Sequence, residues 1–526
     1  MQFFQQLLYL FVAAIALAAA ARRCGAPYPV FLAIGGTVIA LLPAGPALSL
    51  PPDVALALFV APVLLDSAYD MSTRDLRENW KPVAGLVVFC VGLTTAAVAF
   101  VAHYLVPALP WAGAVALGAM VAPPDAVAAG AVLRQLHPPQ RILTVLEGES
   151  LFNDATALLI YHLALGAVAA HSFTWGALGP AFLLNVVGSM LAGPVLAWIN
   201  VWVMERIEHV PTAIILQFVV TFGVWIAADA AGLSAVLTMV CFAITMKRTA
   251  PRRLSARVRI PTNAVWGTAV FALNILAFIF IGMQLRPILL ALPAPVLLQY
   301  LAVAGAVLAT VIVVRFAWHM PFNALVRWHH RRDGFHPPHP TLRPTLGSGL
   351  VVSWAGMRGI VTLAAAMALP HGFPQRDLIV VVAFSVAVGT LVLQGLTLKP
   401  LLRALNLHDD DPVGHEIDAG RTKAFAQGLA SIEQIDTPAA DAVRKRFASL
   451  ARYRQGCEGT EGHGALYARA LRAARRAILA MRASDEIGDD AFHDIEQELD
   501  WLEMALGTDG QNAESAAPDS AMGNDA

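Results

Sequence analysis

Charged residues are scarce in this sequence: Asp, Glu, Lys and Arg make up 14% of its 526 residues, whereas a soluble domain has roughly 25%. Hydrophobic residues make up 57%, and the mean hydropathy is +0.61. This shortage of charge excludes an ordinary soluble enzyme. Cysteine is also rare, because the chain has only four cysteines, with no CxxC pair and no cysteine–histidine ligand spacing. The sequence therefore predicts neither a disulfide framework nor a zinc site, and we expect no cofactor.

The few charges are distributed unevenly along the chain. Residues 1–402 contain 23 basic and 14 acidic residues, whereas residues 403–526 contain 13 basic and 23 acidic residues. We therefore divide the chain into a basic transmembrane domain, residues 1–402, and an acidic cytoplasmic tail, residues 403–526. The end of the tail is polar, which is typical of disorder.

The tail has helical patterns near residues 420–455, 464–483 and 489–506. The second of these is rich in arginine and the third in aspartate and glutamate. We predict a helical hairpin that is held by an apolar face and by opposite charges. The alternative is a helix that lies on the lipid surface.

The apolar runs of residues 1–402 divide at proline, glycine and charged residues into thirteen segments. A helix needs about 20 apolar residues to cross a bilayer core of roughly 30 Å, and fewer where it is broken or buried. The first segment has the composition of a signal peptide, but no basic residue precedes it and Arg22 and Arg23 follow it, so we interpret it as an uncleaved span. The segments lie near residues 3–21, 29–43, 52–67, 82–106, 110–133, 144–170, 177–204, 211–229, 232–246, 264–285, 296–318, 345–370 and 378–402. The fold class is thus an all-α membrane protein with about 13 transmembrane helices.

Lysine and arginine residues are strongly biased between alternate loops. One set of loops carries 18 of them, and the opposite set carries only Arg286 and Arg376. Short basic loops lie on the cytoplasmic side of a membrane. The bias therefore predicts an external N-terminus and a cytoplasmic tail.

The fifth segment contains two consecutive prolines, Pro123 and Pro124, directly before Asp125. Two prolines at mid-span remove two N–H donors, so the helix must break there. Broken backbone is tolerated at membrane depth only where it lines a cavity or is buried in protein. A half-helix that starts near Asp125 would present its N–H groups to that carboxylate. The alternative is a simple proline kink that Asp125 caps.

The twelfth segment has a second weak helical stretch, which contains Gly356, Arg358 and Gly359. If segments 1–6 and 8–13 form two inverted repeats of six helices, the two interrupted segments are each fifth in their half. Interrupted helices at corresponding positions are the best sequence-level indication of a transporter's binding site.

The sixth segment contains four polar side chains that fall on two adjacent faces of a helix, since each residue advances by about 100°. Ser150 and Asp154 share one face and offer hard oxygen ligands for a small cation. Glu149 and Asn153 share the other face, which leaves the Glu149 carboxylate to pair with Arg358. The alternative for Asp154 is a neutral buried carboxyl.

These motifs together resemble those of the monovalent cation:proton antiporters, specifically the bacterial members of the sodium/proton exchanger branch. EGESLFNDAT, residues 147–156, is similar to the ion-site motif of that family almost letter for letter. APPDAVA, residues 122–128, and GMRG, residues 356–359, resemble its two broken-helix motifs. A weaker match, PVLLDSAY at residues 62–69, contains Asp66.

The resemblance implies a role for each of these residues. The roles are cation or proton binding at Asp154, ion ligation at Ser150 and Asp66, support of the site at Asp125, and a structural ion pair between Glu149 and Arg358. Asn153 is assigned to the ion-binding site with these residues, and it stands where electrogenic relatives have a second aspartate, which implies electroneutral exchange. Pro124 departs from many animal exchangers, and this bears on cation selectivity.

The resemblance also implies a function, which is exchange of Na⁺ or Li⁺ for H⁺ across the bacterial inner membrane in pH and sodium homeostasis. The transported Na⁺ would bind at Asp154, and the protein would be a homodimer with no nucleic-acid partner. A K⁺/H⁺ antiporter is the alternative. A cation channel would need a pore lined by repeated carbonyls or charge rings, and the chain has no HExxH or GxSxG motif of an intramembrane enzyme.

Overall fold

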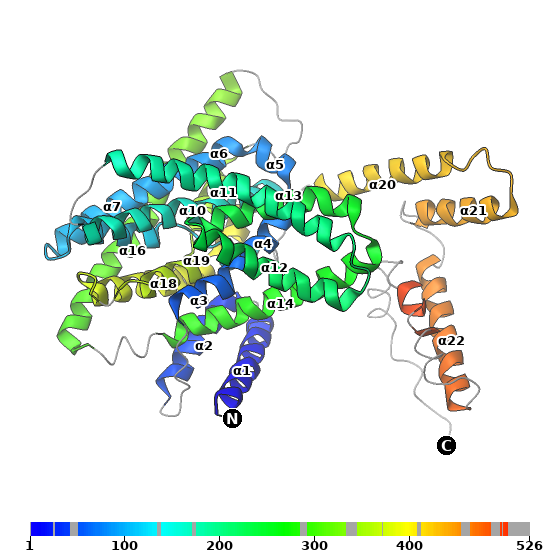
Figure 1. Ribbon diagram of the computed structural model, residues 1–526, viewed down its shortest axis with the longest axis horizontal. Coiled ribbons are helices and arrows are strands. Elements are labelled where there is room, and N and C mark those ends of the chain that lie inside the picture. The colour runs from blue at the N-terminus through cyan, green and yellow to red at the C-terminus, as the bar shows by residue number, and fades with distance from the viewer. Residues whose placement is uncertain are drawn as a thin grey trace. The chain divides into compact units, whose positions relative to one another are not determined.

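The computed structural model describes residues 2–24, 27–42, 51–133, 138–170, 175–284, 292–332, 344–370, 372–407, 412–453, 463–484, 495–496 and 498–502. Within these residues every regular element is helical (Figure 1). The chain divides into two compact units, Met1–Asp410 and Asp411–Ala526. The histidine-rich loop that follows residue 332 lies largely outside the described residues, including His336 and His339.

The first unit is built of α-helices, and two π-helical turns join neighbouring helices. The α-helices are α1 Gln2–Cys24, α2 Tyr28–Leu41, α3 Pro52–Ala55, α4 Ala61–Asp70, α5 Thr73–Glu78, α6 Trp80–Ala84, α7 Val91–Leu105, α8 Trp111–Val121, α9 Ala126–Leu133, α10 Gln140–Ala170, α11 Trp175–Met204, α12 Val210–Ala230, α13 Ala235–Arg253, α14 Ala256–Met283, α16 Ala294–Arg332, α17 Leu346–Trp354, α18 Ile360–Met367 and α19 Arg376–Leu405. The π-helical turns are η1 Leu56–Val60, which joins α3 to α4, and η2 Gly85–Cys90, which joins α6 to α7.

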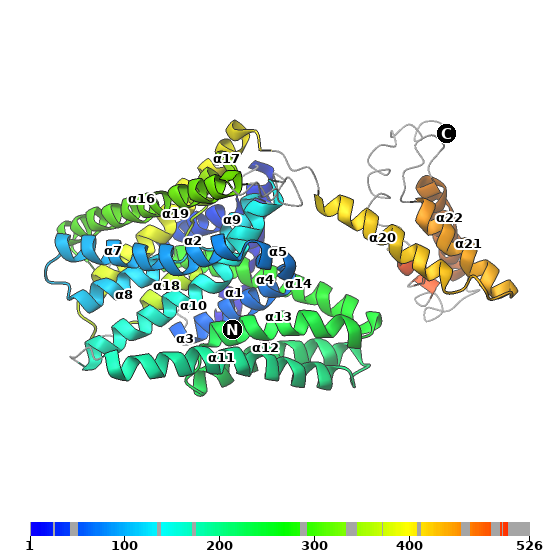
Figure 2. The ribbon, with the colours of Figure 1, turned by 90° about the horizontal axis from the view of Figure 1, so that it is seen from above.

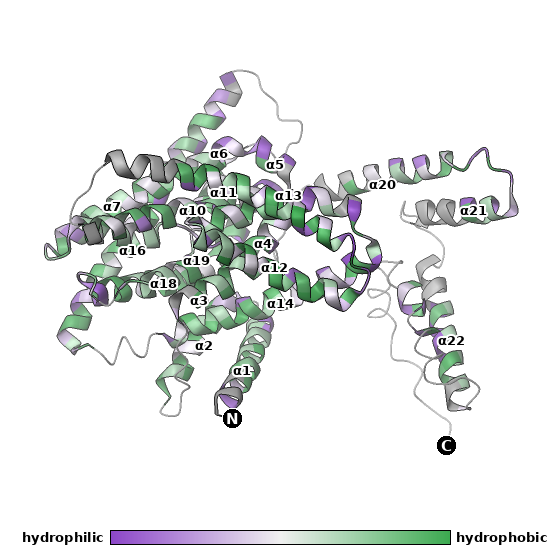
Figure 3. Cartoon of the chain, viewed as in Figure 1, coloured by the Kyte–Doolittle hydropathy of each residue, from purple (hydrophilic) through white to green (hydrophobic). Residues whose placement is uncertain are grey.

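This unit is a multi-pass membrane protein, as the sequence predicts. Seven helical runs in the described residues are long and apolar enough to cross a bilayer, and α2 and α8 are shorter apolar helices. Hydrophobic residues predominate along these helices, whereas α5 and α6 carry hydrophilic ones (Figure 3). Each of the thirteen expected segments contains described helix, and the number of helices that span the membrane stays a prediction.

The helix ends follow local sequence rules. Proline lies in the first turn of α2 and of α12, where its missing N–H costs nothing because that N–H has no partner within the helix. Ser234 caps α13 by accepting a hydrogen bond from the Leu237 N–H at 3.2 Å. At the start of α17, Thr345 and Ser348 form a reciprocal capping box.

The helices of this unit pack against neighbours in the sequence and against helices that are far away in it. α11, α12 and α13 lie together, and α7 lies between α8 and α16 (Figure 2). The crossing of α2 and α14 depends on two glycines, because a Cβ on Gly36 would overlap the Ile279 carbonyl and one on Gly282 would overlap the Ala33 carbonyl. Small residues at such a crossing let two backbones approach closely.

The second unit contains α20 Pro412–Ala430, α21 Pro438–Tyr453 and α22 His463–Ala483. The expected helix at residues 489–506 is described only at residues 495–496 and 498–502, which are helical. Arg475 of α22 forms an ion pair with Asp500 at 2.5 Å. This contact between opposite charges is of the kind that the sequence predicts for the hairpin.

Candidate functional site

The fifth segment is broken where the two prolines lie. α8 ends at Val121 and α9 begins at Ala126, and the backbone between them is not helical. The Asp125 carboxylate accepts a hydrogen bond from the Val127 N–H at 2.8 Å. Asp125 therefore caps the second half-helix as the sequence predicts, because a carboxylate satisfies N–H groups that have no partner at a helix start.

The twelfth segment is broken in the same way, and the two breaks meet. α17 ends at Trp354, and α18 begins at Ile360. The Asp125 N–H donates to the Met357 carbonyl at 2.6 Å. A Cβ on Gly359 would overlap the Asp125 carboxylate, so this close approach requires glycine. The interrupted helices therefore form one joined structure, although they are more than 200 residues apart in the sequence.

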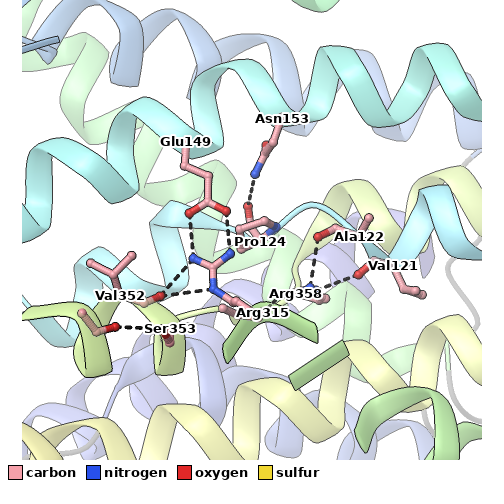
Figure 4. A network of polar contacts seen from close by, with 11 residues as sticks. Val121, Ala122, Pro124, Glu149, Asn153, Arg315, Val352, Ser353 and Arg358 are labelled. Carbon is pink, nitrogen blue, oxygen red and sulfur yellow. Dashed lines mark hydrogen bonds and ion pairs between the residues drawn. The ribbon is translucent and has the colours of Figure 1, made fainter. Parts of the chain in front are cut away.

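The predicted ion pair between Glu149 and Arg358 is wrong. The Arg358 guanidinium donates to the Val121 carbonyl at 2.7 Å, to the Ala122 carbonyl at 3.0 Å and to the Gly356 carbonyl (Figure 4). In an unbroken helix, the carbonyls of Val121 and Ala122 would accept from the N–H groups four residues later. The break removes those donors, so Arg358 binds the free carbonyl end of α8, where a cation also interacts favourably with the helix dipole.

Glu149 instead pairs with Arg315 of α16. The two Arg315 Nη atoms bind the two Glu149 carboxylate oxygens at 2.5 and 2.7 Å (Figure 4). Both side chains are buried, with 2% and 1% of their surface exposed. Arg315 also donates to the Val352 carbonyl at 3.1 and 3.0 Å. This carbonyl lies just before the second break, so one guanidinium links α10, α16 and α17.

Asp154 of α10 lies at a cavity of about 60 Å³, which can hold several water molecules. Its side chain is buried, with 7% of the residue surface exposed. Ser150 and Asp125 line the same cavity, together with Pro123, Pro124 and Gly359 of the two breaks. The structure thus brings together the hydroxyl and the two carboxylates that the sequence assigns to an ion site.

Two other residues that the sequence assigns to the ion site do not line this cavity. Asp66 lines a separate cavity of about 40 Å³, together with Tyr69, Gln217, Arg259 and Asn263. The neighbouring Ser67 lines the Asp154 cavity in its place, since successive helical residues face directions about 100° apart. Asn153 is fully buried and its amide donates to the Pro124 carbonyl at 3.3 Å, so Asn153 holds the first break rather than facing the cavity.

Three residues of this region have no role assigned from the sequence. Arg315 could have been found, because an arginine inside an apolar segment needs a partner, but it lies near the end of its segment and resembles an interfacial residue. Glu147 and Thr362 also line the Asp154 cavity. Helical spacing places Glu147 near the face of Ser150 and Asp154, whereas no local signal marks Thr362.

Comparisons with known proteins agree with this arrangement. The family model described as "Sodium/hydrogen exchanger, transmembrane" matches residues 9–404. A sodium, potassium, lithium and rubidium/H⁺ antiporter of Bacillus pumilus (strain SAFR-032) is 29% identical over 395 residues, which are 72% of this chain and 57% of that protein. The matched part of this chain thus spans little more than half the length of that relative.

Two further proteins match over most of their length. An uncharacterised Na⁺/H⁺ exchanger of Escherichia coli (strain K12) is 26% identical over 520 residues, which are 91% of this chain and 94% of that protein. The solved structure of a sodium proton antiporter from Methanocaldococcus jannaschii has a TM-score of 0.58 and 17% identity, and covers 77% of this chain and 99% of that chain. At 17% identity, the likeness to the Methanocaldococcus jannaschii structure is a likeness of fold.

Proposed function

Because the chain belongs to the sodium/hydrogen exchanger family, we propose that it is a secondary antiporter that exchanges a monovalent cation for a proton across the membrane. The cation is Na⁺ or Li⁺. The observation that carries this proposal is the joining of two broken helices beside a cavity that is lined by Asp154, Ser150 and Asp125. Broken backbone at membrane depth is characteristic of transporter ion sites.

Asp154 is the group for which the two substrates compete. A carboxylate binds either a proton or a small hard cation, and Ser150 supplies a further oxygen ligand four residues earlier on α10. A buried ionised carboxylate without a partner is costly, so the site crosses the membrane loaded with one substrate or the other. This competition couples the two fluxes.

One-for-one, electroneutral exchange is supported by Asn153. The amide at this position carries no proton to exchange, and it is engaged with the Pro124 carbonyl. Glu149 is likewise held by Arg315. We assign the exchange of ligands to Asp154, which lines the cavity on the same helical face as Ser150, and Asp125 supports it from the break.

The cavity lies between two groups of helices, which supports alternating access by movement of one group against the other. Phe59, Val60 and Ser67 line it from the run formed by α3, η1 and α4, and Asp154 and Thr362 line it from α10 and α18. In this proposal the group α6–α10 with α16–α19 moves against α1–α4 with α11–α14, which form the scaffold of a homodimer. In this proposal the protein lies in the bacterial inner membrane, and the loop charges support an external N-terminus and a cytoplasmic tail.

Potassium is a second candidate substrate. The Bacillus pumilus relative is named for potassium and rubidium as well as sodium and lithium. The geometry around Asp154 fits the same mechanism with a larger ion, since the cavity can hold several water molecules.

The proposal is tested in proteoliposomes with an acidic interior and a dye that reports internal pH. Addition of Na⁺ or Li⁺ should make the interior more alkaline, and collapse of the membrane potential should leave the rate unchanged. A response to K⁺ alone would identify K⁺ as the transported cation and leave the mechanism unchanged. No response to any of the three ions, from folded and correctly reconstituted protein, would contradict the proposal.

A further inference from the structure

Thr362 brings a hydroxyl to the ion cavity from the second broken helix. It is the third residue of α18, and Gly359, Ile360, Val361 and Thr362 all line the cavity. The first turn of α18 therefore faces the space that Asp154 and Ser150 face from α10. Only 1% of the Thr362 surface is exposed.

The Thr362 hydroxyl has no hydrogen-bond partner among the described residues. Other helical threonines of this chain, such as Thr144 and Thr221, donate to the carbonyl four residues earlier. That residue for Thr362 is Arg358, which lies in the non-helical break. The interruption of the helix thus frees a buried hydroxyl beside the cavity. Buried polar groups of this kind are normally satisfied by a protein group, water or ligand.

We propose that Thr362 is a ligand of the transported cation, and that its hydroxyl oxygen completes an oxygen ligand set with Asp154 and Ser150. This inference rests on the proposed function and names a binding residue of the same site. Small hard cations prefer several oxygen ligands, and a threonine hydroxyl offers two lone pairs. The second broken helix then contributes to cation affinity directly, as well as supporting Asp125 through Gly359.

Thr362→Val removes the hydroxyl and keeps the shape of the side chain. If Thr362 is a ligand, this variant should raise the KM for Na⁺ roughly tenfold or more, because an interaction with a charged group is lost. The maximal rate should change by less than about twofold, since the lost contact is one of substrate binding. Thr362→Ser keeps the hydroxyl and should restore a KM near that of the wild type.

Thr238→Val is the matched control. Thr238 of α13 is fully buried and its hydroxyl also lacks a partner among the described residues, but it does not line the ion cavity. A structural effect of removing an unpartnered hydroxyl should appear equally in Thr238→Val and Thr362→Val. A ligand effect should appear in Thr362→Val alone.

Cation binding to purified protein in detergent gives a readout that does not require transport. The Na⁺ concentration that gives half of the thermal stabilisation should rise in Thr362→Val and Thr362→Ala by the same factor as the KM. Unchanged half-saturation and KM in both variants would overturn the inference and indicate that a water molecule satisfies the hydroxyl. If the wild type shows neither binding nor transport of Na⁺, Li⁺ or K⁺, the proposed function itself is contradicted. A failure of the Thr362 inference alone looks different, because the wild type then still binds and transports the cation.

Discussion

Removing one member of the Glu149–Arg315 ion pair should destabilise the membrane unit strongly. Glu149→Gln leaves the Arg315 guanidinium buried without its carboxylate, and Arg315→Met leaves the carboxylate buried without its cation. The two groups are 2.5 Å apart at their closest atoms. Breaking such a buried pair from one side costs about 3–5 kcal/mol of unfolding free energy, because a charge remains uncompensated.

A double-mutant cycle separates this pair from the Glu149–Arg358 pair that the sequence suggested. Glu149→Gln and Arg315→Met together should cost less than the sum of the two single variants, because no buried charge is left without a partner. Glu149→Gln and Arg358→Met should be nearly additive, since Arg358 binds carbonyl groups of the breaks instead.

The assay is unfolding of purified protein in detergent, with the exposed ion pair Arg253–Glu205 as control. Its side chains are 44% and 42% exposed and 3.3 Å apart, so Glu205→Gln should cost at most about 1 kcal/mol. The assignment of a buried Glu149–Arg315 ion pair is refuted if Glu149→Gln lowers the unfolding free energy no more than Glu205→Gln does. It is also refuted if Glu149 couples to Arg358 more strongly than to Arg315.

Three further predictions concern the ion site and its supports. Asp154→Asn should abolish exchange without preventing membrane insertion, and normal exchange by the inserted variant would refute its assignment. Gly359→Ala should lower the unfolding free energy by about 1–3 kcal/mol, because the new methyl group overlaps Asp125. Gly223→Ala in α12 meets open space and should instead raise the unfolding free energy by up to about 1 kcal/mol; equal effects in thermal unfolding would contradict this contrast. The KM for the cation should fall as pH rises, because fewer protons compete for Asp154, and a pH-independent KM would argue against a shared site.

The fold was largely predictable from local patterns. Proline pairs, glycine and apolar run lengths predict the two broken helices, and α8, α9, α17 and α18 follow those patterns. Local patterns could not predict that the two breaks meet through the Met357 carbonyl and the Asp125 N–H. That contact depends on tertiary packing between segments far apart in the sequence.

The site was predictable where its residues lie on one helix and uncertain where they do not. Helical spacing placed Ser150 and Asp154 on one face, and both line the cavity. The partner of Glu149 was assigned to Arg358 because that arginine is at mid-span, but the broken helix gives Arg358 carbonyl groups to bind. The Thr362 hydroxyl has no partner among the described residues because of where α18 begins, and no sequence pattern predicts that helix start to within one residue.

The central claim is that one carboxylate, Asp154, binds either the cation or the proton. The most direct measurement is proton release from purified protein in weakly buffered detergent solution when Na⁺ is added. The wild type should release a proton for each cation bound, and Asp154→Asn should release none. Equal proton release by the folded Asp154→Asn variant would contradict this claim.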